Sequence, residues 1–245
     1  MNSITAVPFD KPTSDQRLIG DPLRPSGRHV LTFNGRQGRR SELTDARLSR
    51  FGPYRQLPPG PLDPACAFGR MAPVVLEIGC GHGAAAVAYA ASHPEWDLVA
   101  IDVHVPGLAR LMAVADEDGV GDNLRVDRED AVAFLADRVA PGQLAAIHLF
   151  FPDPWPKERH RGRRFVRPDT LDLIADRLAP DGELLVATDQ DAYAEHVEQM
   201  VKEHGVLTAS LASRPAWRPT DGFEAKGLAA RRTITDLRIR HGAVA

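Results

Sequence analysis

A glycine-rich turn between two apolar segments is the first feature of the chain whose residue types could do chemistry. Val74 to Ile78 form a short apolar run interrupted only by Glu77, as expected of a strand buried on both faces of a parallel sheet. Gly79, Gly81 and Gly83 follow, directly before an Ala-rich stretch that favours a helix. Because alternating glycines leave the backbone bare where the strand turns into the helix, the pattern predicts a ligand that approaches closely there.

The charge beside this turn narrows the class of ligand. A dinucleotide fingerprint spaces its glycines G-x-G-x-x-G and binds a pyrophosphate at the helix N-terminus, whereas this turn reads G-x-G-x-G. Glu77 adds a carboxylate, which suits a cation better than a pyrophosphate. S-adenosylmethionine carries a sulfonium and an ammonium group, so the turn favours this ligand. A glycine-rich turn that binds no ligand is the alternative.

Further carboxylates follow the ends of other predicted strands. Asp102 lies about twenty residues beyond the turn, the offset at which a carboxylate can bind the ribose hydroxyls of a nucleoside. Asp130 precedes a predicted helix, where it could accept a hydrogen bond from an adenine amino group or simply cap the helix. Asp153 and Asp189 follow two later strands. Since the carboxyl ends of parallel strands meet at one edge of a sheet, these acids are expected in one cleft.

The segment Phe150 to Lys157 reads Phe-Phe-Pro-Asp-Pro-Trp-Pro-Lys. Prolines on both sides of Asp153 fix the backbone and prevent the strand from continuing, so the carboxylate is expected at the rim of the sheet between aromatic neighbours. An acidic acceptor beside a stacking surface suits a flat heterocycle. An ordinary rigid loop is the alternative.

Apolar runs alternate with segments of helical periodicity from the glycine turn onward. Alternation of this kind predicts an α/β fold with a doubly wound, mostly parallel sheet of seven strands and an antiparallel edge. Strands are expected at residues 74–78, 97–102, 123–126, 145–151, 183–188, 206–211 and 233–239, and helices at 84–91, 106–116, 131–139, 170–178 and 193–201.

Residues 1–64 are expected to form an N-terminal arm, and residues 65–245 the Rossmann-like domain. The first 25 residues have no periodicity, residues 29–33 could form a short strand, Ser41 could cap a helix that reaches Phe51, and a Pro- and Gly-rich connector follows at 52–64. Residues 1–70 contain eleven Lys and Arg against six Asp and Glu, and residues 157–167 form a second basic cluster. Local basic patches of this kind can bind phosphates, or they can be ordinary solvated surface.

Composition excludes several classes of protein. Of the 245 residues, 43% are hydrophobic, which is enough apolar material for a substantial core. The formal net charge is -3. Cys66 and Cys80 have no metal-ligand spacing, and two cysteines do not make a disulfide framework. We see neither an apolar run long enough for a membrane span nor a signal peptide, and the histidines show no metal-binding spacing. A cytoplasmic protein without a metal is therefore expected.

The motifs together resemble one family. Leu-Glu-Ile-Gly-x-Gly-x-Gly, Phe-Phe-Pro-Asp-Pro-Trp-x-Lys, Lys-x-Arg-His-x-x-Arg-Arg from Lys157, and Ala-Thr-Asp ending at Asp189 are similar to motifs of the bacterial tRNA (guanine-N7)-methyltransferases. The resemblance extends from about Leu31 to Ile239. It implies a Rossmann-like fold and transfer of the methyl group of S-adenosylmethionine to N7 of a guanine in the variable loop of tRNA.

The resemblance also implies roles for residues at matching positions. Asp153 would be catalytic and would also contact the cofactor. The remaining cofactor-binding residues would be Glu77, Gly79, Gly81, Gly83, Asp102 and Asp130, and the substrate-binding residues would be Lys157, Arg159, Arg163, Arg164, Asp189, Phe223 and Glu224.

The chain departs from the family pattern mainly on the acceptor side. Asp221-Gly222-Phe223-Glu224 stands where the family has Thr-Lys/Arg-Phe-Glu, and Asp102 stands where Glu is usual. Three functions stay open: methylation of tRNA, methylation of a ring nitrogen in a small purine-like heterocycle, or RNA binding without catalysis. The partner is accordingly tRNA or a small heterocycle, with no membrane and no metal, and the protein is expected to be a monomer or a homodimer.

Overall fold

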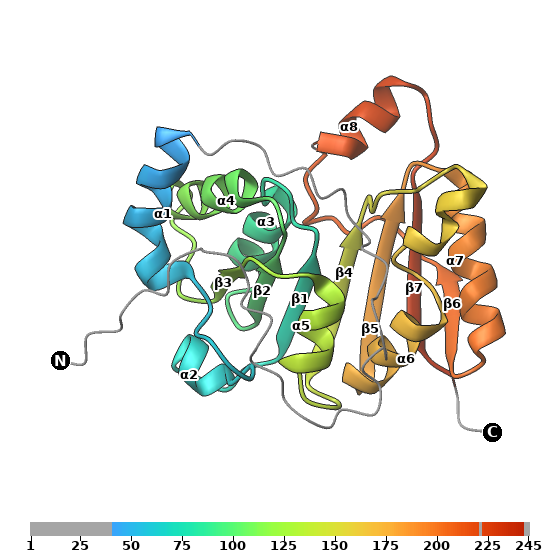
Figure 1. Cartoon of the computed structure of the whole chain (residues 1–245), viewed down its shortest axis with the longest axis horizontal. Coiled ribbons are helices and arrows are strands. Elements are labelled where there is room, and N and C mark those ends of the chain that lie inside the picture. The colour runs from blue at the N-terminus through green and yellow to red at the C-terminus, as the bar shows by residue number, and fades with distance from the viewer. Residues whose placement is uncertain (1–40, 221, 243–245) are drawn as a thin grey trace.

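The computed structural model describes residues 41–220 and 222–242, which contain one sheet in the order β3-β2-β1-β4-β5-β7-β6 (Figure 1). The first five strands along the chain are parallel, and β7 is antiparallel to both of its neighbours. The strands are β1 (Val74–Ile78), β2 (Asp97–Ile101), β3 (Leu124–Asp127), β4 (Leu144–Phe150), β5 (Leu178–Thr188), β6 (Leu207–Leu211) and β7 (Thr235–His241).

Helices lie on both faces of this sheet. α5, α6 and α7 contribute to one hydrophobic cluster, and α3 and α4 to the other, with α1 packed on α4. The helices are α1 (Glu42–Arg55), α2 (Pro64–Phe68), α3 (Ala84–Ser92), α4 (Val105–Glu117), α5 (Ala131–Asp137), the 3-10 helix η1 (Glu158–Arg163), α6 (Pro168–Arg177), α7 (Asp191–His204) and α8 (Gly222–Ala229). The predicted doubly wound α/β fold is confirmed.

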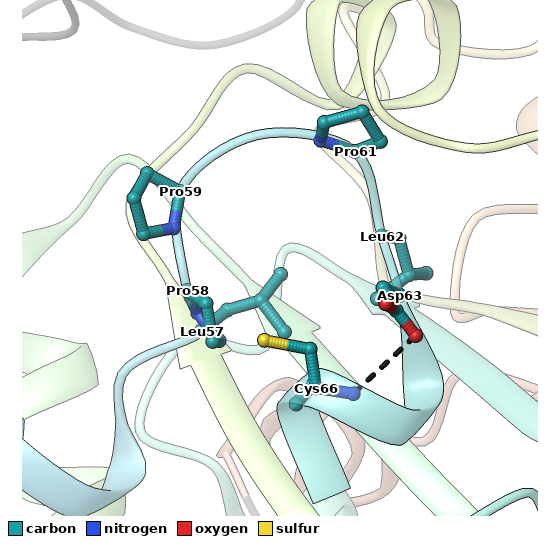
Figure 2. Close-up of a pocket in the computed structure, with 8 residues that line it drawn as sticks. Leu57, Pro58, Pro59, Pro61, Leu62, Asp63 and Cys66 are labelled. Atoms are coloured by element: carbon teal, nitrogen blue, oxygen red, sulfur yellow. Dashed lines mark hydrogen bonds between the residues drawn. The ribbon is translucent and has the colours of Figure 1, made fainter. Parts of the chain in front are cut away.

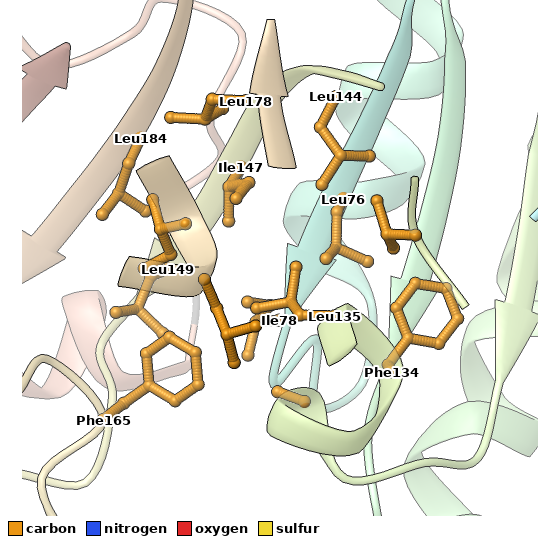
Figure 3. Close-up of a cluster of buried hydrophobic side chains, with 14 of the residues drawn as sticks. Leu76, Ile78, Phe134, Leu135, Leu144, Ile147, Leu149, Phe165, Leu178 and Leu184 are labelled. Carbon is orange, nitrogen blue, oxygen red and sulfur yellow. The ribbon is translucent and has the colours of Figure 1, made fainter. Parts of the chain in front are cut away.

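The central strand β1 explains why both faces need cover. All five of its residues are buried, and successive side chains point to opposite faces. Leu76 and Ile78 join the cluster beneath α5 and α6, where Phe134 and Phe165 also pack (Figure 3). Val75 packs on the opposite face with residues of α3 and α4. The apolar run in the sequence therefore marks a strand that is covered on both sides.

The strands and helices predicted after the glycine turn are confirmed, although several ends differ. β5 begins at Leu178 rather than at Glu183, because Leu178 already pairs with Leu144 across an irregularity in register. α1 is capped by Ser41 as predicted, but it continues past Phe51 through Pro53 in its last turn. Arg55 at its end donates to two backbone carbonyls, which holds that turn in place.

Three short elements were not predicted: α2, η1 and α8. Of these, α2 carries ordinary local signals, since Asp63 caps it, Pro64 begins it and Gly69 ends it in the left-handed region. The expected arm at residues 1–25 and strand at 29–33 lie outside the described residues. The division of the chain at residue 64 stays a prediction.

The sheet topology fixes where a ligand can bind. The chain moves outward from β1 in one direction through β2 and β3, and in the other through β4 and β5. In open α/β sheets, ligands bind beyond the carboxyl ends of the strands at such a switch point. α8 lies beyond this edge in Figure 1. Among the described residues, no helix combines the length and the apolar character that crossing a membrane requires.

Candidate active site

The glycine turn after β1 is held by its own backbone and by one carboxylate. Gly79, Gly81 and Gly83 all have left-handed φ angles of 71°, 57° and 83°, which other residues rarely adopt. The backbone N–H groups of Gly79 and Cys80 donate to the carbonyl oxygen of Ile101, and the N–H of Gly81 donates to Oδ2 of Asp102 at 2.8 Å. The turn is thereby fixed to the end of β2.

The three glycines differ in what a side chain would meet. A Cβ atom built on Gly79 or Gly81 has no neighbour within 4 Å, so the backbone there faces open space. A Cβ on Gly83 would lie 2.2 Å from Cγ of Leu111. Gly79 and Gly81 therefore leave room for a ligand, whereas Gly83 is needed for the packing of α3 against α4.

Asp102 and Asp130 both accept hydrogen bonds from the backbone. Asp102 accepts from the N–H of Gly81 and, through Oδ1, from the N–H of His104 at 2.8 Å. Asp130 caps α5 by accepting from the N–H groups of Val132 and Ala133 at 3.0 and 3.2 Å. These contacts orient the carboxylates, and their predicted contacts with ribose and adenine stay predictions.

The segment between β4 and η1 has a strained backbone. Phe151 and Trp155 have φ angles of 51° and 40°, which are uncommon for residues with large side chains. The N–H of Phe151 donates to the carbonyl oxygen of Ala187 at 2.7 Å, and Nε of the buried Arg164 donates to that of Pro154 at 3.0 Å. These two bonds hold both ends of the Pro-Asp-Pro segment against the end of the sheet.

Asp153 is exposed on this held loop. Its pKa is raised, first by partial loss of solvent around the carboxylate and then by the negative charge of Asp102. The charge of Asp102 at the end of β2 thus acts on the carboxyl group of the loop after β4. That the carboxylates from separate strands form one ligand-binding cleft stays a prediction.

Basic side chains surround Trp155 at the edge of the loop. The guanidinium of Arg163 lies 4.8 Å from the centre of the indole ring, and His160 meets the ring edge-on at 5.6 Å. The pKa of His160 is lowered by desolvation and then by the positive charges of Arg159, Arg163 and Lys157. Neutral His160 thus sits within an exposed cluster of cations.

Two predicted substrate-binding acids have internal partners. Asp189 forms an ion pair with Arg232, in which Oδ2 of the carboxylate lies 2.6 Å from a guanidinium nitrogen. Glu224 is buried and binds Arg214 and Arg218, at 2.5 and 3.1 Å. These contacts tie α8 and the segment before β7 to the rim. A direct contact of either acid with substrate stays a prediction.

Arg218 links Glu224 of α8 to the sheet. Its guanidinium also pairs with Asp236 of β7 and lies 5.0 Å from the centre of the Phe150 ring at the end of β4. By contrast, Phe223 on the same helix is 62% exposed, with Nζ of Lys226 at 5.2 Å from its ring. α8 is therefore anchored by one face and presents an aromatic ring and a cation on the other.

Comparison with known proteins identifies the family. Residues 71–237 match the family model Methyltransf_4, which is described as "Putative methyltransferase". The tRNA (guanine-N(7)-)-methyltransferase of Aromatoleum aromaticum is 41% identical over 94% of this chain and 90% of its own length. The one from Mycolicibacterium paratuberculosis is 39% identical over 94% of this chain and 93% of its own. The chain belongs to the tRNA (guanine-N(7)-)-methyltransferase family.

Family membership confirms the resemblance drawn from the glycine turn and the Pro-Asp-Pro-Trp segment, and with it the enzyme class and S-adenosylmethionine as cofactor. The crystal structure of the 16S rRNA methyltransferase KamB is similar to this methyltransferase, with a TM-score of 0.51 and 17% identity over 72% of this chain and 90% of that one. At this identity the likeness supports the Rossmann-like fold alone.

Residues important to the site's architecture escaped prediction. Arg214, Arg218 and Arg232 occur in a polar, irregular part of the chain, and their partners are distant or depend on how the helix packs. Asp127 at the end of β3 was also missed. It is an acid at a strand end like the others, but it pairs with Arg138, and its burial raises its pKa.

One cavity of about 320 Å³ lies away from the rim of this methyltransferase (Figure 2). It is formed by α2 and the connector that precedes it, and none of the predicted site residues lines it. Over residues 41–220 and 222–242, no three His, Cys, Asp or Glu side chains gather as a metal site would require. The cavity is lined by Leu57, Pro58, Pro59, Pro61, Leu62, Asp63, Cys66 and Ala67.

Proposed function

We propose that this methyltransferase transfers the methyl group of S-adenosylmethionine to N7 of a guanine in the variable loop of tRNA. The observation that carries the proposal is a rim with a bare glycine turn and an exposed Asp153, in a chain 41% identical over 94% of its length to an enzyme named for this activity. Such an acceptor would place the enzyme in the cytoplasm. We expect it to act without a metal, as a monomer or a homodimer.

The residues at the glycine turn fit the cofactor. Open space over Gly79 and Gly81 leaves room for it, and backbone contacts already orient Asp102 and Asp130. The carboxylate of Glu77 complements its positive charge. When bound, S-adenosylmethionine supplies an electrophilic methyl group on a sulfonium.

The acceptor atom limits what the protein must supply. Guanine N7 has a lone pair and bears no proton, so no side chain has to act as a general base. Positioning is then the main source of rate, since well-oriented reactants gain about 7–11 kcal/mol over free encounter. We assign Asp153 two tasks: accepting hydrogen bonds from the guanine edge and stabilising the positive charge that the ring gains.

The acceptor would bind across η1 and α8. Lys157, Arg159 and Arg163 are suited to phosphate contacts, and the exposed ring of Phe223 to stacking on a base. Arg164, Asp189 and Glu224 would act by holding these elements in place. Residues 1–64, as a basic arm, would add phosphate contacts.

The test is incubation of the purified protein with labelled donor and tRNA that lacks modifications, followed by mass mapping of nucleosides. The proposal expects 7-methylguanosine at one position of the variable loop. Consumption of a free purine with unlabelled tRNA would instead identify the small-heterocycle enzyme. Retention of tRNA without donor turnover would identify an RNA-binding relative.

A further inference from the structure

A buried contact between Glu77 and His148 lies beneath the glycine turn. The two residues are register partners on the adjacent strands β1 and β4, and their side chains are 4% and 1% exposed. Oε2 of Glu77 and Nδ1 of His148 are 3.9 Å apart, and neither atom has a hydrogen-bond partner among the described residues. Leaving two buried polar atoms unpaired is costly, so this pair calls for an explanation.

Aromatic rings hold His148 in this orientation. Its imidazole stacks on Phe150 at 5.1 Å and on Trp217 at 5.2 Å, both with an interplanar angle of 26°. Tyr89 of α3 meets the ring edge-on at 5.0 Å. These contacts fix the plane of the imidazole, and in this orientation its Nδ1 faces Oε2 of Glu77 at 3.9 Å.

Other charged or titratable groups near this contact are engaged or neutral. Burial raises the pKa of the Cys80 thiol well above its usual value, with smaller contributions from Asp102 and Glu77, so the thiol stays neutral. Arg218, which lies over Phe150, pairs with Glu224 and Asp236 instead. His148 is therefore the donor placed to meet Glu77.

We propose that His148 is a positioning residue for cofactor binding. Its Nδ1–H donates to Oε2 of Glu77, after an approach of about 1 Å to hydrogen-bond distance, and keeps the carboxylate oriented for the positive charge of the cofactor. Oε2 is shut off from solvent, so the cofactor meets the carboxylate from its other side while His148 supports it from within. The inference rests on the proposed role of Glu77 in holding S-adenosylmethionine.

The test is calorimetric measurement of S-adenosylmethionine binding to His148→Phe, which keeps a stacking ring and removes the donor. A hydrogen bond to a charged group predicts a rise in Kd of about 10- to 100-fold, with kcat at saturating donor unchanged. His148→Gln, which restores an N–H donor, should recover part of the affinity. Wild-type affinity in His148→Phe would overturn the proposal.

A matched control is His93→Phe. His93 stacks on Tyr89 in the same aromatic cluster at 4.2 Å, but its Nδ1 lies 3.1 Å from the Tyr89 carbonyl oxygen. We expect its Kd for the donor to equal that of the unmodified protein. An equal loss in both variants would reduce His148 to a packing role.

A double-mutant cycle separates action through Glu77 from a general effect. In a Glu77→Gln background, His148→Phe should change the Kd by less than about twofold, since the two residues act as one unit. An undiminished effect there would contradict the proposal. Should His148→Phe fail to fold, the near-isosteric pair His148→Gln and His148→Met replaces it, and equal affinities of the pair would overturn the inference. Failure of the proposed function would look different: the unmodified protein would bind the donor but leave tRNA unlabelled, and the donor affinities of these variants would still test the role of His148.

Discussion

The rim has two halves, a cofactor half at the glycine turn and the start of α5 and an acceptor half around α8. Their carboxylates are held by different kinds of partner. At the glycine turn, Asp102 and Asp130 accept hydrogen bonds from the backbone of the turn and of α5. On the acceptor side, Glu224 and Asp189 pair with arginines, and aromatic and basic side chains face outward. The carboxylates of the first half are held by backbone N–H groups, and those of the second by ion pairs with side chains.

This difference indicates which carboxylates are expected to bind a ligand and which hold structural elements in place. A carboxylate oriented by backbone N–H groups keeps lone pairs for a ligand, whereas a buried ion pair mainly fixes the elements that carry it. The cofactor half is therefore expected to lose binding when altered, and the acceptor half to lose stability or phosphate contacts. Each of the following experiments tests one side of this contrast.

Asp153→Ala is expected to have the largest effect. Removing one group that stabilises developing charge costs about 10²–10³-fold in rate, so methyl transfer should fall by about that factor while donor affinity stays within a few-fold. Single-turnover rates and calorimetry measure the two quantities. Asp181→Ala, an exposed acid of β5 away from the rim, is the control. Near-normal turnover in Asp153→Ala would remove this residue from the mechanism.

Glu224→Ala tests whether the acceptor half depends on internal ion pairs. It leaves Arg218 buried without one of its two partners, a change that typically costs about 3–5 kcal/mol of unfolding free energy. Urea denaturation measures the loss. Phe223→Ala on the same helix removes an exposed ring and should leave stability within about 0.5 kcal/mol. Equal stability of the two variants would contradict the supporting role of Glu224.

Gly83→Ala and Gly81→Ala separate packing from ligand access within one turn. Both place alanine at a left-handed φ, which costs about 1–2 kcal/mol. Only Gly83→Ala also drives a Cβ into Leu111, which adds about 1–3 kcal/mol of unfolding free energy. Gly81→Ala should lose donor affinity instead. The distinction fails if thermal unfolding ranks the two variants in the opposite order.

Arg159→Ala sharpens the proposed phosphate contacts. Loss of one contact should weaken tRNA binding severalfold and reduce the slope of log K against log salt by about 0.9, with kcat unchanged. The control is Arg240→Ala, which removes an exposed arginine of β7 that pairs with Glu183 of β5. An unchanged salt slope in Arg159→Ala would exclude this phosphate contact.

Asp102→Asn should weaken donor binding, as expected of the cofactor half, and should also shift the titration of Asp153, which is the smallest effect in this series. Since the charge of Asp102 raises the pKa of Asp153, removing it should lower that pKa toward the ordinary value. The acid limb of the rate profile of the unmodified enzyme accordingly lies at higher pH than that of an ordinary aspartate. NMR titration of the Asp153 carboxyl measures the change. A pKa that stays the same or rises would contradict the approach of the two acids.

The same contrast explains what the sequence could predict. The strands around the glycine turn follow from continuous apolar runs such as Val74–Ile78, and the cap of α1 from Ser41, because both are local patterns. The extension of α1 through Pro53 overrides a local breaker signal, because Arg55 is anchored to a distant loop.

Residues whose role depends on tertiary partners were beyond local reading. The link from Glu224 through Arg218 to Asp236 joins residues up to 18 positions apart, and no periodicity signals it. The contact of Glu77 with His148 depends on strand order and register, which set β4 rather than β3 beside β1. Carboxylates at strand ends were predictable in kind, whereas Asp189 gave no sign of its pairing with Arg232.

Mapping of methylated nucleosides after reaction with unmodified tRNA tests the central claim most directly. The account predicts labelled 7-methylguanosine in the variable loop, made by the unmodified enzyme and reduced by about 10²–10³-fold in Asp153→Ala. Methylation at another atom, or tRNA left unlabelled by an enzyme that binds the donor, would contradict it.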